Sequence, residues 1–256
     1  MFTLHNGDGI QYLRSIHSGS ISAIITDPPY GINAGMMNLG FSQSSRIEKS
    51  EWDEMPPSSD DLNFLANSAP VVVIWGGNYF PLPPSRCFLI WDKGGGFKDR
   101  SFSECELAWT NLDSPARIYK RDPLANGDYL KRYHKTQKPI ALMSWVIENF
   151  TNEGDVIYDP YMGSGSTGVA CVETGRVFIG SEINPKYFAV AEKRIKQAVR
   201  KPNFFTPSNN RLHLDVGDSP AQKDLFTLEA GSAAGKSPKP AHTLVTQAVR
   251  PLRQRL

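Results

Sequence analysis

A short apolar segment, residues 21–26 (Ile-Ser-Ala-Ile-Ile-Thr), runs directly into Asp27, Pro28, Pro29 and Tyr30. Its β-branched residues are typical of a buried strand, and the two prolines that follow indicate a rigid turn. Such a turn fixes one carboxylate acceptor and one flat aromatic ring at the carboxyl end of the strand. In α/β folds ligands bind at this edge of the sheet. The segment therefore predicts a strand that ends at a ligand site.

Strand patterns and helix patterns alternate along the first 200 residues, which predicts an α/β fold with a mostly parallel sheet and helices on both faces. Strands are expected at residues 2–5, 21–26, 71–75, 87–91, 106–109, 155–158 and 176–181. Helices are expected at 10–16, near 59–68, after Pro139, at 166–174 and after Asn184 and Pro185, which supply an N-cap and a first-turn proline. The segments 31–60 and 92–133 are expected to be largely irregular, apart from the strand at 106–109.

Charge is unevenly distributed, although the net charge of the chain is only +2. Residues 201–256 hold eight basic and four acidic side chains, include a low-complexity stretch, and are expected to form a flexible tail. Residues 117–138 hold seven basic side chains against two acidic ones. Such a stretch either contacts the phosphates of a nucleic acid or forms a solvated, charged loop.

Composition excludes several classes of protein. The three cysteines lie far apart and one must stay unpaired, which fits a reducing compartment better than a disulfide framework, and no metal-ligand spacing is present. No apolar run approaches the length of a membrane helix, and the first residues lack the pattern of a signal peptide. These features predict a cytoplasmic protein without a membrane or metal partner.

A second motif, residues 159–168, lies between a predicted strand and a predicted helix. Gly163, Gly165 and Gly168 have the spacing G-x-G-x-x-G, which lets the backbone approach a ligand closely. Glu182 follows 19 residues after Gly163, at the end of the next predicted strand, where a carboxylate can accept hydrogen bonds from ribose hydroxyls. On this pattern alone, a dinucleotide site of an oxidoreductase is an open alternative.

The two motifs together resemble those of the S-adenosylmethionine-dependent DNA amino-methyltransferases that modify adenine N6 or cytosine N4. Residues 134–139 (His-Lys-Thr-Gln-Lys-Pro) are similar to the family's segment upstream of the cofactor loop, and Glu182 is similar to its ribose-binding acid. The base-site motif precedes the cofactor motif, as in the circularly permuted β group. The resemblance covers about residues 1–200. Two positions depart from the family's usual pattern: Lys135, where proline is more frequent, and Tyr161, where phenylalanine is more frequent.

This resemblance implies a Rossmann-like methyltransferase fold in residues 1–200, with S-adenosylmethionine as cofactor and double-stranded DNA as partner. The segments 31–60 and 92–133 are then candidates for contacting DNA, and 201–256 is a separate tail. The residues implied in catalysis are Asp27, Pro28, Pro29 and Tyr30. The residues implied in cofactor binding are Asp8, Thr136, Lys138, Pro139, Asp159, Tyr161, Gly163, Ser164, Gly165, Ser166, Thr167 and Glu182. For Asp8 a place in an ordinary Asn-Gly-Asp turn is equally open. For Lys138 a phosphate contact or a solvated position is equally open.

The chemistry of an exocyclic amine gives the catalytic residues their expected roles. The target base must leave the helix, at a cost of a few kcal/mol. Asp27 and the Pro28 carbonyl would each accept a hydrogen bond from the amine, while Tyr30 would stack on the ring for about 1–3 kcal/mol. No cysteine lies near the motif, which argues against methylation at cytosine C5.

Asp27, in place of serine before Pro-Pro-Tyr, favours adenine N6 as the target, with cytosine N4 as a close alternative. Weaker alternatives are methylation of RNA adenine or of protein glutamine, and a DNA-binding regulator that has lost catalysis. The β group often forms homodimers, so a homodimer is open, as is a restriction endonuclease partner. The DNA recognition sequence depends on contacts that these motifs do not encode.

Overall fold

The structure is a computed structural model that describes residues 1–17, 19–31, 56–98, 103–130, 133 and 137–201. These residues lie in the first of two structural units, Met1–Arg211, whereas the second, Leu212–Leu256, lies outside the described residues. The tail that was expected to be flexible therefore lies outside the described residues, and so does most of the segment 31–60.

In the described part of the chain, eight strands form one sheet in the order β1-β8-β7-β2-β3-β5-β4-β6. The strands are β1 (Phe2–Asn6), β2 (Ala23–Thr26), β3 (Val71–Trp75), β4 (Phe88–Asp92), β5 (Cys105–Thr110), β6 (Arg117–Lys120), β7 (Val156–Asp159) and β8 (Val177–Glu182). β5 is antiparallel to both of its neighbours, and every other pair is parallel. The prediction of a mostly parallel sheet is confirmed.

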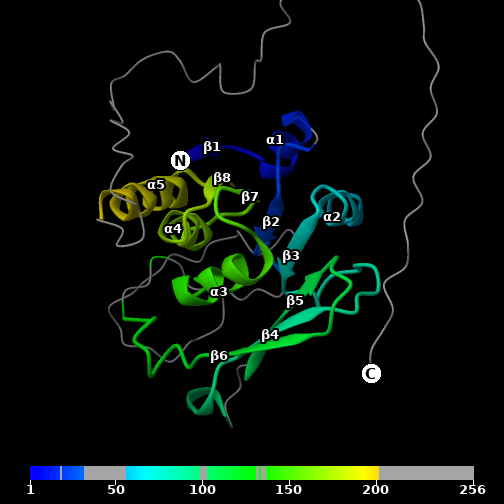
Figure 1. Cartoon of the computed structure of the whole chain (residues 1–256), viewed down its shortest axis with the longest axis vertical. Coiled ribbons are helices and arrows are strands. Elements are labelled where there is room, and N and C mark those ends of the chain that lie inside the picture. The colour runs from blue at the N-terminus through cyan, green and yellow to red at the C-terminus, as the bar shows by residue number, and fades with distance from the viewer. Residues whose placement is uncertain (18, 32–55, 99–102, 131–132, 134–136, 202–256) are drawn as a thin grey trace, which may run out of the picture. The chain divides into compact units, whose positions relative to one another are not determined.

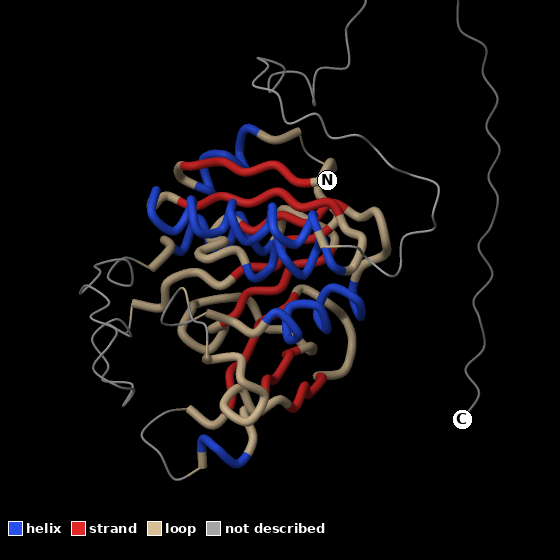
Figure 2. Tube along the Cα trace, turned by 90° about the vertical axis from the view of Figure 1, so that its left-hand side faces the viewer, coloured by secondary structure: helices blue, strands red, loops and turns tan. Residues whose placement is uncertain are grey.

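Helices cover both faces of this sheet (Figure 1 and Figure 2). They are α1 (Gly9–Ser15), α2 (Ser59–Ala66), α3 (Ile140–Phe150), α4 (Ser166–Glu173) and α5 (Pro185–Arg200), with a short 3-10 helix, η3 (Gly95–Phe97). α3, α4 and α5 pack with Ile25 of β2 on one face, whereas α1 and α2 pack with Ile24 on the other. Successive strand residues thus enter opposite cores, as the two-residue period of a strand requires. None of the helices in the described ranges is long and apolar enough to cross a membrane.

Local capping explains where the helix that follows β8 begins. The side chain of Asn184 accepts hydrogen bonds from the backbone N–H groups of Lys186 and Tyr187, and Pro185 occupies the first turn. Both groups suit a helix start, because the first backbone donors have no partner inside the helix. The predicted start of α5 is confirmed.

The segment 92–133 differs from the expectation of an irregular insertion. Besides the predicted strand at 106–109, residues Arg117–Lys120 form β6, which extends the sheet by pairing in parallel with β4. As an edge strand it buries little, and Ile118 is 67% exposed. The expectation was therefore wrong for these residues, because backbone pairing rather than side-chain burial holds them in the sheet.

Candidate active site

The two sequence motifs meet at one edge of the sheet. β2 and β7 are adjacent and parallel, with Ala23 opposite Ile157 and Ile24 opposite Tyr158. Since the carboxyl ends of parallel strands lie at the same edge, the turn 27–30 and the loop 159–168 are neighbours although the chain separates them widely. The β7 motif follows the β2 motif in sequence, which is the permuted order expected from the resemblance.

Asp159 joins the two motifs directly. Its Oδ1 accepts hydrogen bonds from the hydroxyl of Thr26, at 2.7 Å, and from the backbone N–H of Tyr161, at 3.1 Å. Its Oδ2 accepts from the hydroxyl of Thr167, at 2.6 Å. Burial raises the pKa of Asp159 to about 7, although the hydrogen bonds from Thr167 and Thr26 oppose that rise. These contacts hold the glycine loop against the end of β2, one residue before Asp27.

The three glycines of the loop have different surroundings. A Cβ on Gly165 would lie 2.9 Å from that of Ala191, and one on Gly168 would lie 2.5 Å from Cδ1 of Ile195, so both glycines allow close packing of α5. Gly163 has a φ of +51°, and a Cβ there would meet no described atom within 4 Å. Of these three glycines, only Gly163 therefore faces open space in which a ligand could approach the backbone.

The serines of the same loop provide polar groups close to Gly163. Ser164 accepts hydrogen bonds from the buried guanidinium of Arg194, through both its carbonyl and, at 2.9 Å, its Oγ. The Ser164 hydroxyl also donates to the side chain of Gln137, at 3.1 Å. The Oγ of Ser166 is buried without a hydrogen-bond partner among the described residues, although a hydroxyl group can both donate and accept.

Glu182 and Asp8 lie beside this loop. Glu182 accepts hydrogen bonds from the backbone N–H groups of Gly163, at 3.0 Å, and Asn184, at 2.8 Å, which leaves a further lone pair on each carboxylate oxygen. Asp8 caps α1 by accepting hydrogen bonds from the backbone N–H groups of Ile10 and Gln11. Next to these acids lies a cavity of about 250 Å³, which Asp8, Tyr161 and Glu182 help to line.

On the β2 side, Asp27 and Tyr30 face each other. The Tyr30 hydroxyl donates a hydrogen bond to Oδ1 of Asp27, at 2.6 Å. The ring of Tyr30 is stacked on that of Tyr79, with centroids 5.0 Å apart, and it packs against Gly76, where a Cβ would lie only 2.2 Å from its Cε1. Pro28 is buried and Pro29 is half-buried. The turn is thus held by its own hydrogen bond and by packing against the turn after β3.

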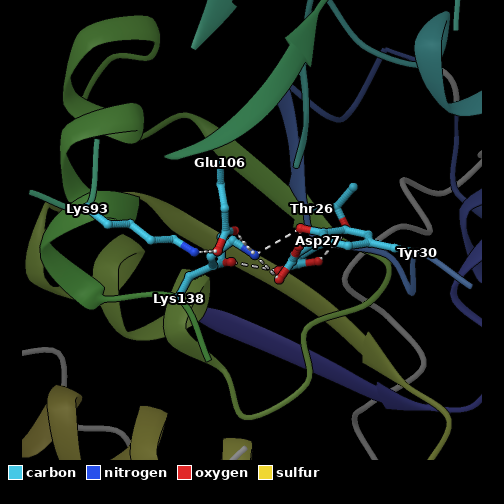
Figure 3. A network of polar contacts seen from close by, with 8 residues as sticks. Thr26, Asp27, Tyr30, Lys93, Glu106 and Lys138 are labelled. Atoms are coloured by element: carbon cyan, nitrogen blue, oxygen red, sulfur yellow. Dashed lines mark hydrogen bonds and ion pairs between the residues drawn. The ribbon is translucent and has the colours of Figure 1, made fainter. Parts of the chain in front are cut away.

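A buried lysine completes this side of the site (Figure 3). The Nζ of Lys138 lies 2.6 Å from Oδ2 of Asp27, 3.1 Å from the hydroxyl of Tyr30 and 3.0 Å from Oε2 of Glu106. Glu106 in turn pairs with Lys93, at 2.7 Å. Lys138 therefore lies against the turn 27–30 and is neither solvated nor free for a phosphate. Sequence reasoning missed Glu106 and Lys93; a carboxylate in the otherwise apolar strand 106–109 was the available signal.

The charged groups of this network shift one another's pKa values. Burial alone would raise the pKa of Glu106, but the ammonium groups of Lys138 and Lys93 outweigh it and lower that pKa to about 2. Burial likewise favours neutral Lys138, but Asp27 and Glu106 raise its pKa well above the ordinary value. The pKa of Asp27 is raised by burial, an effect that Lys138 opposes and Glu106 reinforces.

Of the other two residues predicted from the upstream segment to bind the cofactor, Thr136 and Pro139, the structure describes only Pro139. Pro139 is buried and precedes the first residue of α3. Thr136 lies outside the described residues, as do His134 and Lys135. A cofactor contact by Pro139 or Thr136 stays a prediction.

Comparison with known proteins identifies the family. The sequence profile of the N6_N4_Mtase family, described as DNA methylase, matches residues 85–193. The type II methyltransferase M.HpaI of Haemophilus parainfluenzae is 40% identical over an alignment of 263 residues, which covers 86% of this chain and 82% of that protein.

Two solved structures share the fold. The M1.HpyAVI–SAM complex superposes with a TM-score of 0.50 at 23% identity, covering 76% of this chain and all of that chain (100%). The cytosine-N4-specific PvuII DNA methyltransferase superposes with a TM-score of 0.50 at 18% identity, covering 82% of this chain and 88% of that chain. The fold is therefore the Rossmann-like methyltransferase fold, and the chain belongs to the S-adenosylmethionine-dependent DNA amino-methyltransferases of the N6-adenine/N4-cytosine family.

Proposed function

We propose that this protein methylates the exocyclic N6 amine of an adenine that has been extruded from double-stranded DNA. One observation carries the proposal: an acceptor turn, residues 27–30, and a glycine loop, residues 159–168, lie side by side at one sheet edge and are joined by the hydrogen bond between Thr26 and Asp159. A reaction between two bound molecules needs such adjacent sites, because most of the acceleration comes from alignment.

The loop side fits S-adenosylmethionine. Open space lies over Gly163, the Ser166 hydroxyl lacks a partner among the described residues, and a cavity of about 250 Å³ adjoins Glu182. The free lone pairs of Glu182 suit the ribose hydroxyls, and Asp8 and Tyr161 line the space beyond it, where the adenine would lie. When bound, the cofactor supplies an electrophilic methyl group on a sulfonium.

The turn side fits the base. Asp27 and the Pro28 carbonyl would accept the two N–H groups of the amine, which turns the nitrogen lone pair toward the methyl donor. Tyr30 would stack on the extruded ring, and its stacking on Tyr79 holds the ring ready for that contact. As the nitrogen gains the methyl group, one amine proton leaves through the carboxylate of Asp27 toward solvent, which restores a neutral product.

Adenine is proposed over cytosine because an aspartate begins the Asp-Pro-Pro-Tyr turn. The second candidate is cytosine N4, since the same acceptors suit either amine and PvuII DNA methyltransferase, which shares the fold, is cytosine-N4-specific. Methylation of RNA or of protein is less favoured because M.HpaI, which aligns with most of this chain, is a type II methyltransferase.

We further propose that residues 1–200 form the catalytic domain, with DNA contacts from 31–60 and 92–133 and the basic tail 201–256 outside it. The exposed residues Arg117 and Lys120 of β6 are suitable phosphate contacts. A DNA substrate favours the cytoplasm, as the sequence does. A homodimer and a restriction endonuclease partner stay open.

The test is to incubate the protein with isotopically labelled S-adenosylmethionine and unmethylated DNA, and then to identify the labelled nucleoside by mass spectrometry. We expect N6-methyladenine. N4-methylcytosine would favour the second candidate, and the absence of label in DNA of varied sequence would overturn the proposal.

A further inference from the structure

We propose that Lys138 is a positioning residue for methyl transfer: it orients the carboxylate of Asp27 and keeps it ionised, while Glu106 and Lys93 hold Lys138 in place. This inference rests on the proposed function, because it gives Asp27 the role of hydrogen-bond acceptor for the amine. It replaces the prediction that Lys138 binds the cofactor.

The geometry of the ammonium group is the first support. An ammonium carries three N–H donors, and Nζ of Lys138 has three acceptors within reach: Oδ2 of Asp27 at 2.6 Å, Oε2 of Glu106 at 3.0 Å and the Tyr30 hydroxyl at 3.1 Å. Its side chain is only 5% exposed. Lys138 thus hydrogen-bonds Asp27 and Tyr30 and forms an ion pair with Glu106, all within the candidate active site.

The orientation of Asp27 follows from the same contacts. Lys138 donates to its Oδ2, and the Tyr30 hydroxyl donates to its Oδ1, at 2.6 Å. Because Lys138 also donates to the Tyr30 hydroxyl, the three groups close a ring of hydrogen bonds. Each carboxylate oxygen keeps a lone pair for the amine, so the ring fixes the acceptor without consuming it.

The charge of Lys138 is the second support. A base stacked over the turn would remove water from Asp27, and a desolvated carboxylate without a cationic partner takes up a proton. Protonated Asp27 would direct an O–H at the amine from one oxygen and lose an acceptor there. The ammonium of Lys138 opposes that protonation at the distance of a direct ion pair.

The outer residues keep Lys138 in position. Glu106 of β5 lies between Lys138 and Lys93, with its Oε1 2.7 Å from Nζ of Lys93, and the side chain of Lys93 is 9% exposed. The four charges alternate in sign from Asp27 to Lys93, so the buried network as a whole is neutral (Figure 3). Loss of one member would leave a buried charge without compensation, which is strongly unfavourable.

The test compares single-turnover methyl transfer, at saturating S-adenosylmethionine, as a function of pH. The charged and titratable groups that face Asp27 are Lys138, Glu106 and Tyr30, with Lys93 behind Glu106 and Asp159 at the end of the neighbouring strand β7. Lys138→Met removes the cation, so we expect a rate about 100-fold lower, as for a misplaced catalytic group, and an acid limb moved to higher pH. Glu106→Gln removes an anion that raises the pKa of Asp27, so its acid limb should move to lower pH.

Opposite shifts of the acid limb are the decisive result, because general structural damage would not give them. Equal or absent shifts would overturn the inference. A second result would also overturn the inference: Lys138→Met binds S-adenosylmethionine more weakly by calorimetry but keeps the wild-type rate at saturating cofactor. Lys138 would then serve cofactor binding. If Lys138→Met does not fold, Lys138→Arg decides: the acid limb should stay in place while the rate falls, and a shifted acid limb would contradict the role.

Two controls separate this inference from the proposed function. Lys196→Met removes a surface lysine of α5, paired with Glu192 at 3.0 Å, and should leave rate and pH profile unchanged. Absence of methyl transfer by the wild-type protein would defeat the proposed function itself. If Asp27→Ala abolishes methyl transfer but Lys138→Met leaves it unaltered, only the inference is overturned.

Discussion

Replacing Asp159 with Asn removes a buried carboxylate whose hydrogen bonds join the two halves of the candidate active site. The amide oxygen can still accept from Thr26 and from the backbone of Tyr161. The amide nitrogen can donate to Thr167, whose hydroxyl can turn to accept. The substitution therefore keeps the hydrogen bonds and removes the titration.

The size of the effect follows from burial. In the folded protein burial raises the pKa of Asp159 from 3.8 to about 7. The folded state thus holds a proton that the unfolded state releases, so the stability that Asp159 contributes is fully present below pH 4 and is lost as the pH rises to about 7. Since one pKa unit corresponds to about 1.4 kcal/mol, the total is about 4 kcal/mol, of which about 2 kcal/mol is lost between pH 5 and pH 7.

The assay is urea unfolding at several pH values, followed by circular dichroism. The free energy of unfolding of the wild type minus that of Asp159→Asn should fall by about 2 kcal/mol from pH 5 to pH 7 and level off only above about pH 8. Asp60→Asn, at an exposed position in the first turn of α2, should follow the wild type throughout. A difference that is constant, or that rises with pH, would refute the assignment of Asp159 as a buried, destabilised carboxylate.

Three further predictions concern the same two motifs. Gly163→Leu should weaken S-adenosylmethionine binding at least 10-fold, measured by calorimetry. Gly154→Leu, which is also at positive φ and in open space, should lower stability without changing cofactor binding. Equal cofactor affinities of the two variants would contradict the role of Gly163. Tyr30→Ala should lower kcat/KM for DNA about 5- to 150-fold, because the stacking contact is lost. Tyr30→Phe should retain the stacking contribution. If the Phe variant is as impaired as the Ala variant, stacking is not the main role of the ring. Gly168→Ala should lower the free energy of unfolding by about 1–3 kcal/mol, because the new Cβ meets Ile195, and an unchanged unfolding midpoint would count against this packing.

Elements with a strong local signal were predictable from the sequence. The run Val71–Trp75 is uniformly apolar and forms β3 with the predicted bounds. The two motifs could be found because each is contiguous in sequence, and their adjacency followed from the rule that ligand sites form at the carboxyl edge of a parallel sheet. Strand β6 could not be found in this way, because its side chains are largely exposed and its backbone pairing with β4 is not local.

The lysine network was beyond sequence reasoning for a related reason. Antiparallel pairing places Trp91 opposite Glu106, and Lys93, two residues beyond Trp91 on the same face, reaches Glu106 diagonally across the two strands. Lys138 reaches Asp27 across 111 positions of sequence. A lysine within a run of basic residues gives no local sign that it is buried, so its position depends on the arrangement of β4, β5 and the start of α3.

The most direct test of the central claim is to measure methyl transfer and cofactor binding on the same Asp27→Ala preparation. In the proposed mechanism the turn 27–30 holds the base and the glycine loop holds the cofactor, as separable halves of one site. Asp27→Ala should therefore bind S-adenosylmethionine with wild-type affinity but transfer no methyl group to DNA. Methyl transfer that survives in this variant, or cofactor binding that is lost with it, would exclude this division of the site.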